Sequence, residues 1–283
     1  MKYTIRQFNS QFPDEKTCLE FIYRRRFPGG AKCKKCQKVD CFYPVTNRRS
    51  YACAWCGFQI YPTAGSIFHK SRTSLKSWFF AIFLASQSKN GVSAKELERT
   101  VGVTYKTAFR MAHKIKSLMA QGPSMLSGTV EVDETWVGGE NRHGKGSARE
   151  NKSYVVGAVQ RQGMVKAQVI KNTKASTVIP LVRSQIRVGT NVISDEASYY
   201  KKLKNFGYGH ESVKHKRREY VRGHVYTNTI EGFWSQMKRS INGTYHAVSP
   251  KYLQRYVDEF AYRYNARNSS VPVFELLIRQ MAA

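Results

Sequence analysis

The feature that most constrains the fold of this 283-residue sequence is two cysteine pairs near its N-terminus. Cys33 and Cys36 form one Cys-x-x-Cys pair, and Cys53 and Cys56 form a second after sixteen intervening residues. This spacing matches a tetrahedral zinc site with four thiolate ligands, since each tight turn aims two sulfur atoms at one ion. Because metal–ligand energy then replaces a hydrophobic core, we predict a small zinc ribbon.

Two cysteines remain outside this pattern. We expect Cys18 and Cys41 to be small buried residues, although Cys41 is an alternative to one of the four ligands despite its poor distance from Cys36. The N-terminus lacks the apolar core of a signal peptide, so a reducing intracellular setting is expected, with the protein in the cytoplasm and associated with the nucleoid.

The charge balance favours a polyanionic partner. The chain has 47 Lys and Arg against 19 Asp and Glu, a formal net charge of +28, and the basic residues are spread over every segment. A hydrophobic content of 41% excludes a disordered basic tail, and no apolar run approaches the roughly 18 residues of a membrane span. We therefore interpret the surplus as binding to nucleic acid rather than as a soluble basic surface alone.

Residues 74–116 show helical spacing. An aromatic stripe follows Ser74 and is interpreted as core, and Ser93 with Glu96 is typical of a capping box. After a glycine-containing turn at 100–103, a basic helix from Thr104 to Lys116 completes a helix-turn-helix pattern, for which an ordinary helical hairpin is the alternative. Three cations of this second helix are predicted to face the major groove: Lys106, Arg110 and Lys114.

Beyond a linker at residues 121–124, the sequence predicts strands at 129–135, 153–160, 164–170 and 190–194. The first run carries Asp133 and the last ends next to Asp195. Carboxylates at the ends of apolar strands are costly to bury unless a cation compensates, so a divalent metal is expected between these aspartates. The adjacent Glu134 and Glu196 are expected to point to the opposite faces of their strands, in surface or supporting positions.

A third metal ligand is expected from a helix that opens near Thr227. Glu231 lies in its first turn, and Lys238 follows seven residues later, which is about two helical turns. Lys238 therefore shares the face of Glu231 and is expected to bind a DNA phosphate beside the metal. Tyrosines and Phe260, spaced every four residues over 252–264, are interpreted as helix packing.

These motifs together resemble the bacterial insertion-sequence transposases of the DDE type that carry an N-terminal zinc ribbon. The resemblance covers nearly the whole chain. Its segments are FPGG (27–30), PTAGSIF (62–68), YKTA (105–108), VDET (132–135), GG (138–139), TNTIEGFWS (227–235), GTYH (243–246) and YRYN (262–265). One departure is Tyr226, where the family pattern leads us to expect a histidine, so no role of that histidine is transferred.

The resemblance implies an α/β fold with an RNase H-like mixed sheet flanked by helices. It divides the chain into a zinc ribbon (1–70), a helix-turn-helix domain (71–122) and a catalytic domain (123–283). It also implies Asp133 and Asp195 as ligands of Mg²⁺ or Mn²⁺, in addition to the Zn²⁺ of the ribbon. The third position has three interpretations: Glu231, which has the charge and spacing and is preferred; Asn228, which fits a described asparagine variant; or a capping box with Asn228 as N-cap and no metal role.

The implied function is DNA transposition. A transposase of this kind binds terminal inverted repeats, hydrolyses a phosphodiester at the end of the element and joins the freed 3′ hydroxyl to target DNA, acting as a homo-oligomer on DNA and not on a membrane. Two alternatives remain open. One is a transcription regulator with an inactive third domain, and the other is a metal-dependent nuclease without strand transfer. Two basic segments, 138–147 and 214–222, are expected to contact DNA.

Overall fold

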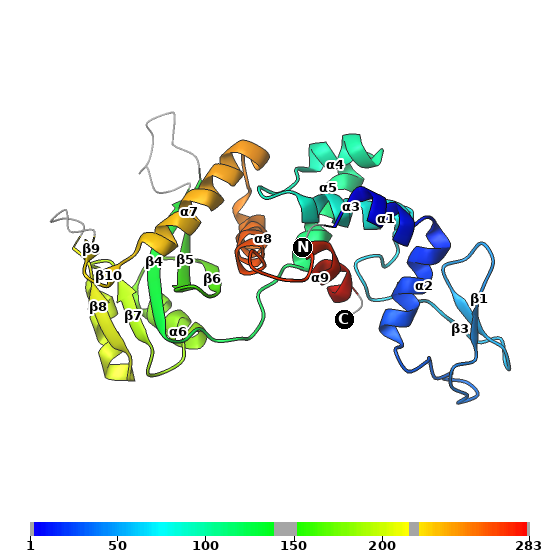
Figure 1. Cartoon of the computed structure of the whole chain (residues 1–283), viewed down its shortest axis with the longest axis horizontal. Coiled ribbons are helices and arrows are strands. Elements are labelled where there is room, and N and C mark those ends of the chain that lie inside the picture. The colour runs from blue at the N-terminus through cyan, green and yellow to red at the C-terminus, as the bar shows by residue number, and fades with distance from the viewer. Residues whose placement is uncertain (1–2, 139–151, 215–220, 282–283) are drawn as a thin grey trace. The chain divides into compact units, whose positions relative to one another are not determined.

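The structure is a computed structural model that describes residues 3–138, 152–214 and 221–281 (Figure 1). The chain folds into two compact units. The N-terminal unit contains Met1–Leu118 and Ser269–Ala283, and the sheet unit contains Met119–Asn268. Most of the two basic segments predicted to contact DNA lies outside the described residues, because 139–151 and 215–220 are not among them.

The N-terminal unit begins with helices and continues into a small antiparallel sheet. Helices α1 (Ile5–Gln11) and α2 (Glu15–Arg26) are followed by strands β1 (Phe42–Pro44), β2 (Tyr51–Cys53) and β3 (Gln59–Ile60), in the order β1-β2-β3. A three-stranded sheet this short buries little apolar surface of its own. Its cysteines must therefore contribute to its stability.

Three further helices follow, at the positions predicted from the 74–116 pattern: α3 (Leu75–Gln87), α4 (Ala94–Val101) and α5 (Tyr105–Ser117). The hydroxyl of Ser74 accepts a hydrogen bond from the amide of Ser77, and that of Ser93 accepts one from Glu96. Gly102 ends α4 at φ +72°, a left-handed conformation that permits the turn into α5. The aromatic stripe of α3 is buried, as predicted.

The last helix, α9 (Val273–Gln280), belongs to the N-terminal unit. Phe274 on α9 is fully buried, and its ring stacks on Tyr3 with centroids 4.6 Å apart and contacts the ring of Phe8 at 5.8 Å. The C-terminal segment therefore packs with the N-terminal helices rather than with the sheet to which the 123–283 boundary assigned it. The division into three domains otherwise stays a prediction.

The sheet unit is built on five strands: β4 (Thr129–Val137), β5 (Ser153–Gln160), β6 (Val165–Ile170), β7 (Asn191–Ser194) and β8 (Gly209–Ser212). Their order is β6-β5-β4-β7-β8. The first three pair antiparallel as a meander, whereas β7 and β8 add parallel to β4. Strand β4 therefore lies at the centre, with β5 on one side and β7 on the other (Figure 1).

Helices cover both faces of this sheet, and each face has its own apolar cluster. The remaining elements are α6 (Ala175–Gln185), η1 (Ser198–Phe206), β9 (Val221–Arg222), β10 (Val225–Tyr226), α7 (Asn228–Ser240), η3 (Ile241–Tyr245), η4 (Pro250–Tyr252) and α8 (Leu253–Asn265). Val132 and Val156 pack with α6 and η1 on one face, and Val155 and Val159 pack with α7 and α8 on the other. The prediction of an α/β fold with a mixed sheet flanked by helices is confirmed.

Among the described residues, no helix combines the length and apolar character needed to cross a membrane. The periodic aromatic positions of α8 are also as predicted, because Phe260 is buried against the sheet and Tyr256 and Tyr264 pack beside it.

Candidate functional site

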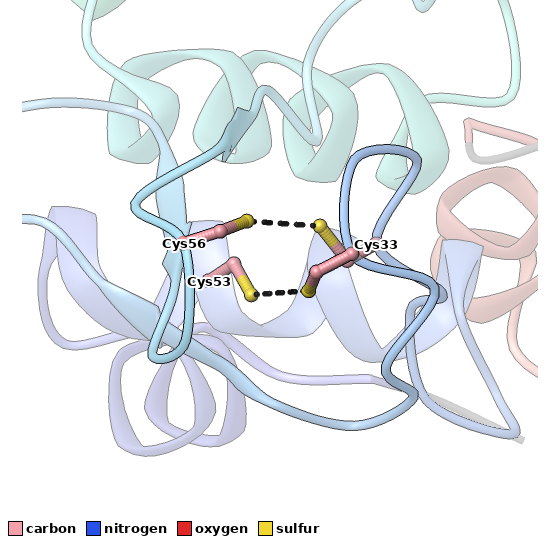
Figure 2. Close-up of side chains that lie close together, drawn as sticks. Cys33, Cys53 and Cys56 are labelled. Carbon is pink, nitrogen blue, oxygen red and sulfur yellow. Dashed lines mark hydrogen bonds between the residues drawn. The ribbon is translucent and has the colours of Figure 1, made fainter.

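The four cysteines of the two knuckles meet in the N-terminal unit. Their sulfur atoms all lie within 4.8 Å of one another. The Sγ atoms of Cys33 and Cys56, which face each other in Figure 2, are 3.5 Å apart. Those of Cys36 and Cys53 are also 3.5 Å apart. A tetrahedral zinc ion with Zn–S bonds of about 2.3 Å holds its sulfurs roughly 3.8 Å apart, so the cluster fits this ion with small adjustments.

Each knuckle has the same backbone turn. The amide of Gln37 donates to the carbonyl of Cys33, and the amide of Gly57 donates in the same way to Cys53. Both donor residues adopt positive φ, 62° for Gln37 and 70° for Gly57, which glycine tolerates without a steric cost. Burial opposes ionisation of the Cys53 thiol, but hydrogen bonds from the amides of Cys56 and Trp55, together with those from the Cys41 and Cys36 thiols, lower its pKa to about 6. The pKa of Cys33 is lowered as well, whereas hydrogen bonds from neighbouring thiols raise those of Cys36 and Cys56, so the turn favours the thiolate at the first cysteine of each knuckle.

The two remaining cysteines have different surroundings. Cys18 is fully buried, as predicted. The Sγ of Cys41 lies only 3.3 Å from that of Cys53, but Cys41 is not in the group of four. The expectation that Cys41 is simply a small buried residue is therefore wrong, because the loop before β1 brings it beside the thiol cluster, half-buried.

The second cluster lies at the end of β7 and joins Asp133, Glu134 and Asp195, each with a carboxylate oxygen within 4.8 Å of the others. Ser194, the last residue of β7, pairs with Val132 of β4. Because β4 continues to Val137, its Asp133 and Glu134 extend past the end of β7, which Asp195 follows directly. The predicted meeting of the two aspartates is thus found in the structure.

Glu134 is the unexpected member of this cluster. The predicted opposite face is confirmed, because the partners of Glu134 lie on η1 whereas Asp133 contacts Trp234 of α7. The predicted surface position is wrong, because β7 ends at Ser194 and the Glu134 carboxylate lies within 4.8 Å of that of Asp195. Its Oε1 accepts hydrogen bonds from the hydroxyls of Tyr199 at 2.5 Å and Tyr200 at 2.6 Å. Burial raises the pKa of Glu134, although these two hydroxyls oppose the rise. Strand alternation alone could not reveal this, since it ignores where the neighbouring strand ends.

Asp133 is the carboxylate with the most perturbed pKa in the cluster. Burial is the largest cause, and repulsion from Glu134 and Asp195 adds to it, so that its pKa is raised to about 7. A cation would offset both the lost hydration and the repulsion between like charges. With three hard oxygen donors, the residues present fit Mg²⁺ or Mn²⁺.

Helix α7 is fixed to β4 on the same face as Asp133. The indole Nε1 of Trp234 donates to Oδ2 of Asp133 at 3.0 Å. Gly157 of β5 pairs directly with Asp133, and a Cβ there would lie 2.5 Å from two atoms of the Trp234 ring. Glycine at this strand position therefore makes room for the indole. Both contacts were missed from the sequence, although a glycine inside a strand is a signal of close approach.

A buried carboxylate, Glu131, anchors the start of α7. It accepts hydrogen bonds from the amides of Thr229 at 2.8 Å and Ile230 at 3.0 Å, and from the hydroxyl of Thr229 at 2.8 Å. Arg161 Nε lies 2.7 Å from Glu131 Oε1 and supplies the compensating charge. Glu131 thus acts as a helix cap supplied by the sheet, two residues before Asp133.

The residues proposed for the third metal position lie on the first turn of α7, outside the acidic cluster. Glu231 is exposed and accepts a hydrogen bond from the Thr227 hydroxyl at 3.0 Å. Asn228 is also exposed, and it is the first helical residue rather than the N-cap, which is Thr227. The capping-box interpretation with Asn228 as N-cap is therefore wrong. Lys238 is half-buried; its burial lowers its pKa while the nearby Asp133 opposes this, and its Nζ lies 5.8 Å from the centroid of the Trp136 ring.

The predicted DNA-contact residues of α5 have unequal exposure. Lys106 and Arg110 are exposed, whereas Lys114 is half-buried and donates from Nζ to the carbonyl of Ile67 at 2.7 Å. The opposite side of α5 is buried, with Ala108 and Met111 in the core.

Comparison with known proteins gives matches over most of the chain. Residues 125–265 match the family model described as an ISXO2-like transposase domain. A Halobacterium salinarum protein named "Uncharacterized protein in transposable element ISH50" is 26% identical over 275 residues, covering 89% of this chain and 91% of its own. A Haemophilus influenzae protein named "Uncharacterized transposase-like protein" is 23% identical over 113 residues, covering 40% of this chain and 89% of its own.

Among solved structures, a chain of the Mos1 strand transfer complex is similar, with a TM-score of 0.32 and 12% identity. The match covers 71% of this chain and 75% of that one.

Proposed function

Residues 125–265 belong to the ISXO2-like transposase domain family, and from this premise we propose that the chain cleaves DNA at the ends of an insertion sequence and joins them to target DNA. The N-terminal unit binds the terminal inverted repeats, and the sheet unit performs both phosphoryl transfers. The observation that carries this proposal is the cluster of Asp133, Glu134 and Asp195 at adjoining strand ends in the matched region.

Asp133 and Asp195 hold the divalent metal in this proposal, with Glu134 beside them. Bound there, Mg²⁺ or Mn²⁺ supplies a Lewis acid that activates water or a 3′ hydroxyl and neutralises charge on the phosphodiester. The tyrosines that hydrogen-bond Glu134 hold its carboxylate in place, and Trp234 does the same for Asp133. The protein's own contribution at this end of β4 is therefore orientation of charged oxygens.

Glu231 is our proposed third ligand. It follows the residues that Glu131 caps and precedes Trp234 by three positions, so it lies on a helix that two contacts fix to β4. To bind the metal, its carboxylate must give up the hydrogen bond that it accepts from the Thr227 hydroxyl. Lys238, whose charge already interacts with Asp133, binds a phosphate oxygen beside the scissile bond.

In the N-terminal unit, we propose that a Zn²⁺-loaded ribbon and the α4–α5 pair bind the repeats. The net charge of +28 provides affinity through the phosphate backbone, and exposed residues of α5 provide sequence contacts. Both units then work on one DNA substrate, with more than one protomer on the DNA.

A strand-transfer assay tests the proposal. The substrate is a duplex from the end of the insertion sequence that encodes this chain, pre-cut to expose its 3′ hydroxyl, with a supercoiled plasmid as target and Mg²⁺ or Mn²⁺ present. Wild type is compared with Asp133→Ala, Asp195→Ala and Glu231→Ala, and with Glu196→Ala as the matched control. Glu196 is adjacent to Asp195 but lies outside the acidic cluster.

We expect joined product from wild type and Glu196→Ala, and a loss of at least about 10³-fold in the two aspartate variants. Joining that persists in Asp133→Ala would eliminate the catalytic assignment. Cleavage of uncut ends without joining identifies a nuclease, and repeat binding by a wild type that neither cuts nor joins identifies a DNA-binding regulator. Comparing Glu231→Ala with Asn228→Ala decides the third ligand.

A further inference from the structure

A cavity of about 490 Å³ lies in the N-terminal unit between α5 and the loop 69–73 that precedes α3. The indole of Trp78 forms part of its wall. The basic side chains among the described lining residues are His69, Lys70, Arg72, Arg110 and Lys114. Of the described residues that line it, none is Asp or Glu. Positive charge therefore converges on this one hollow.

The loop that forms one wall is held in place by Arg49. Its guanidinium donates to the carbonyls of Ser71 and Thr73, each at 2.8 Å, and to Glu15 at 2.7 Å. Because both carbonyls are bonded to one planar group, the loop backbone is fixed before any ligand arrives. The side chains of Lys70 and Arg72 are thus carried by a pre-organised segment.

Lys114 ties the same loop to α5. Its Nζ donates to the carbonyl of Ile67 at 2.7 Å and lies 5.9 Å from the centroid of the Trp78 ring. Burial lowers the pKa of Lys114, and the charge of Arg110 lowers it further. A bound anion would relieve both effects.

We propose that this cavity binds a phosphate group of the DNA backbone, with Arg110 and Lys114 as its principal ligands. The inference rests on the DNA binding put forward under Proposed function and refines it, because it divides the cations of α5 into two roles. Arg110 and Lys114 position the protein on the backbone, which carries no sequence information. Lys106, which is exposed one turn nearer the start of α5 and does not line the cavity, is left to contact base edges.

The arrangement of donors on the cavity walls supports a phosphate. A tetrahedral anion accepts hydrogen bonds from several directions, and a guanidinium together with an ammonium on the walls of one hollow provides donors from more than one side. A phosphate at this place would lie against both the loop and α5, so binding there would orient α5 on the duplex.

The test measures binding of the full-length, zinc-loaded protein to two fluorescent duplexes from 50 to 300 mM salt. One duplex is taken from the end of the element, and the other has the same composition in scrambled order. The variants are Arg110→Ala, Lys114→Met and Lys106→Ala. Arg6→Ala removes an exposed charge from α1, away from the cavity, and serves as the matched control.

We expect each cavity variant to weaken binding to both duplexes equally, by about ten-fold. The slope of log K against log salt should fall by about one in each. Lys106→Ala should instead reduce the preference for the element end. Cavity variants that keep the wild-type salt slope, or that weaken binding to the element end only, would overturn the inference.

Two further measurements separate the possible causes of a loss of DNA affinity. Lys114→Met keeps the buried aliphatic part of the side chain, and Lys114→Arg keeps the charge. Wild-type affinity in Lys114→Arg supports a role for the charge, whereas an equal loss of affinity in the two variants overturns that role. Inorganic phosphate at constant ionic strength is the second probe. If it binds the cavity without competing with the duplex, the assignment to backbone phosphate is overturned. If wild type itself binds neither duplex, the proposed function fails, which is distinguishable from failure of the cavity alone.

Discussion

The two candidate metal centres found among the described residues are built in opposite ways. The thiol cluster comes from 24 consecutive positions, Cys33 to Cys56, and its four sulfurs can fill every position around zinc. The acidic cluster joins Asp133 to Asp195, which are 62 positions apart, and its three carboxylates repel one another. Four thiolates that complete the zinc coordination stabilise the fold of the ribbon. The crowded carboxylates instead repel one another, and a metal that binds between them relieves this repulsion.

The largest expected effect concerns the thiol cluster. Replacing Cys36 with serine, or removing zinc with a chelator, should unfold residues 31–60, because structural zinc contributes on the order of 10 kcal/mol to such modules. Hydrogen exchange measured by mass spectrometry should show lost protection in these peptides, with protection in β4 unchanged. Metal analysis should give about one zinc per wild-type chain.

Cys41→Ser is the matched control for this experiment, since the Cys41 sulfur lies 3.3 Å from that of Cys53 yet outside the group of four. It should retain about one zinc. If Cys41→Ser loses zinc as completely as Cys36→Ser does, Cys41 is a ligand and the set of four is wrong.

The acidic cluster should respond to substitution in the opposite direction. The pKa of Asp133 rises from 3.8 to about 7 on folding. The folded protein therefore holds a proton that the unfolded chain releases, and its free energy of unfolding falls as the pH rises from about 4 to 7. In metal-free protein at pH 8, Asp133→Asn should be more stable than wild type by up to about 4 kcal/mol.

Chemical denaturation from pH 4 to 8, without divalent metal, measures this difference. The difference in free energy of unfolding between Asp133→Asn and wild type should vanish at pH 4, where the wild-type carboxyl is protonated. At pH 8, Mg²⁺ should stabilise wild type and leave Asp133→Asn nearly unchanged. Glu196→Gln, outside the cluster, is the control. A stability difference that does not depend on pH would contradict the repulsion between carboxylates that distinguishes this centre from the thiol cluster.

The contrast also explains what the sequence could predict. Cysteine spacing and the alternating strands are local patterns, so the knuckles and strands β4 to β7 were found close to their predicted positions. The approach of Asp133 to Asp195 was predicted from carboxylates on apolar strands, and the family resemblance implied the same pair. Glu134 points to the face that alternation predicted, but its approach to Asp195 depends on where β7 ends, which no local pattern contains.

Helix α7 and the C-terminus show the same limit. The capping of α7 by Glu131 joins residues about one hundred positions apart, and the sequence offered only a nearby Asn228 as a cap. Phe274 packs on Tyr3, from the other end of the chain, so a boundary based on chain order assigned it to the wrong unit. Side chains that act through distant partners are therefore the part of the site that only the fold reveals.

A smaller effect is expected where β5 meets α7. Gly157→Ala should destabilise the sheet unit by about 2 kcal/mol, because the new methyl group would lie 2.5 Å from Trp234. Thermal unfolding measures the loss. Trp234→Phe removes the two ring atoms that collide, so the double variant should lose less stability than the sum of the two single variants. Additive losses would show that the indole is not what requires glycine.

The smallest predicted effect isolates one hydrogen bond. Trp234→Phe keeps an aromatic ring against β5 but removes the Nε1 donor to Asp133, so the carboxylate loses an orienting contact and its pKa should rise further. Strand transfer should fall about ten-fold at low Mg²⁺ and recover as Mg²⁺ or pH is raised, because metal and proton compete for the same oxygen. Trp55→Phe, an exposed indole in the zinc ribbon, controls for loss of a tryptophan. A loss of strand transfer that neither added metal nor higher pH restores would mean that Trp234 acts through packing alone. Helix α7 would then only position the carboxylates, as the turns of the two knuckles position the thiols.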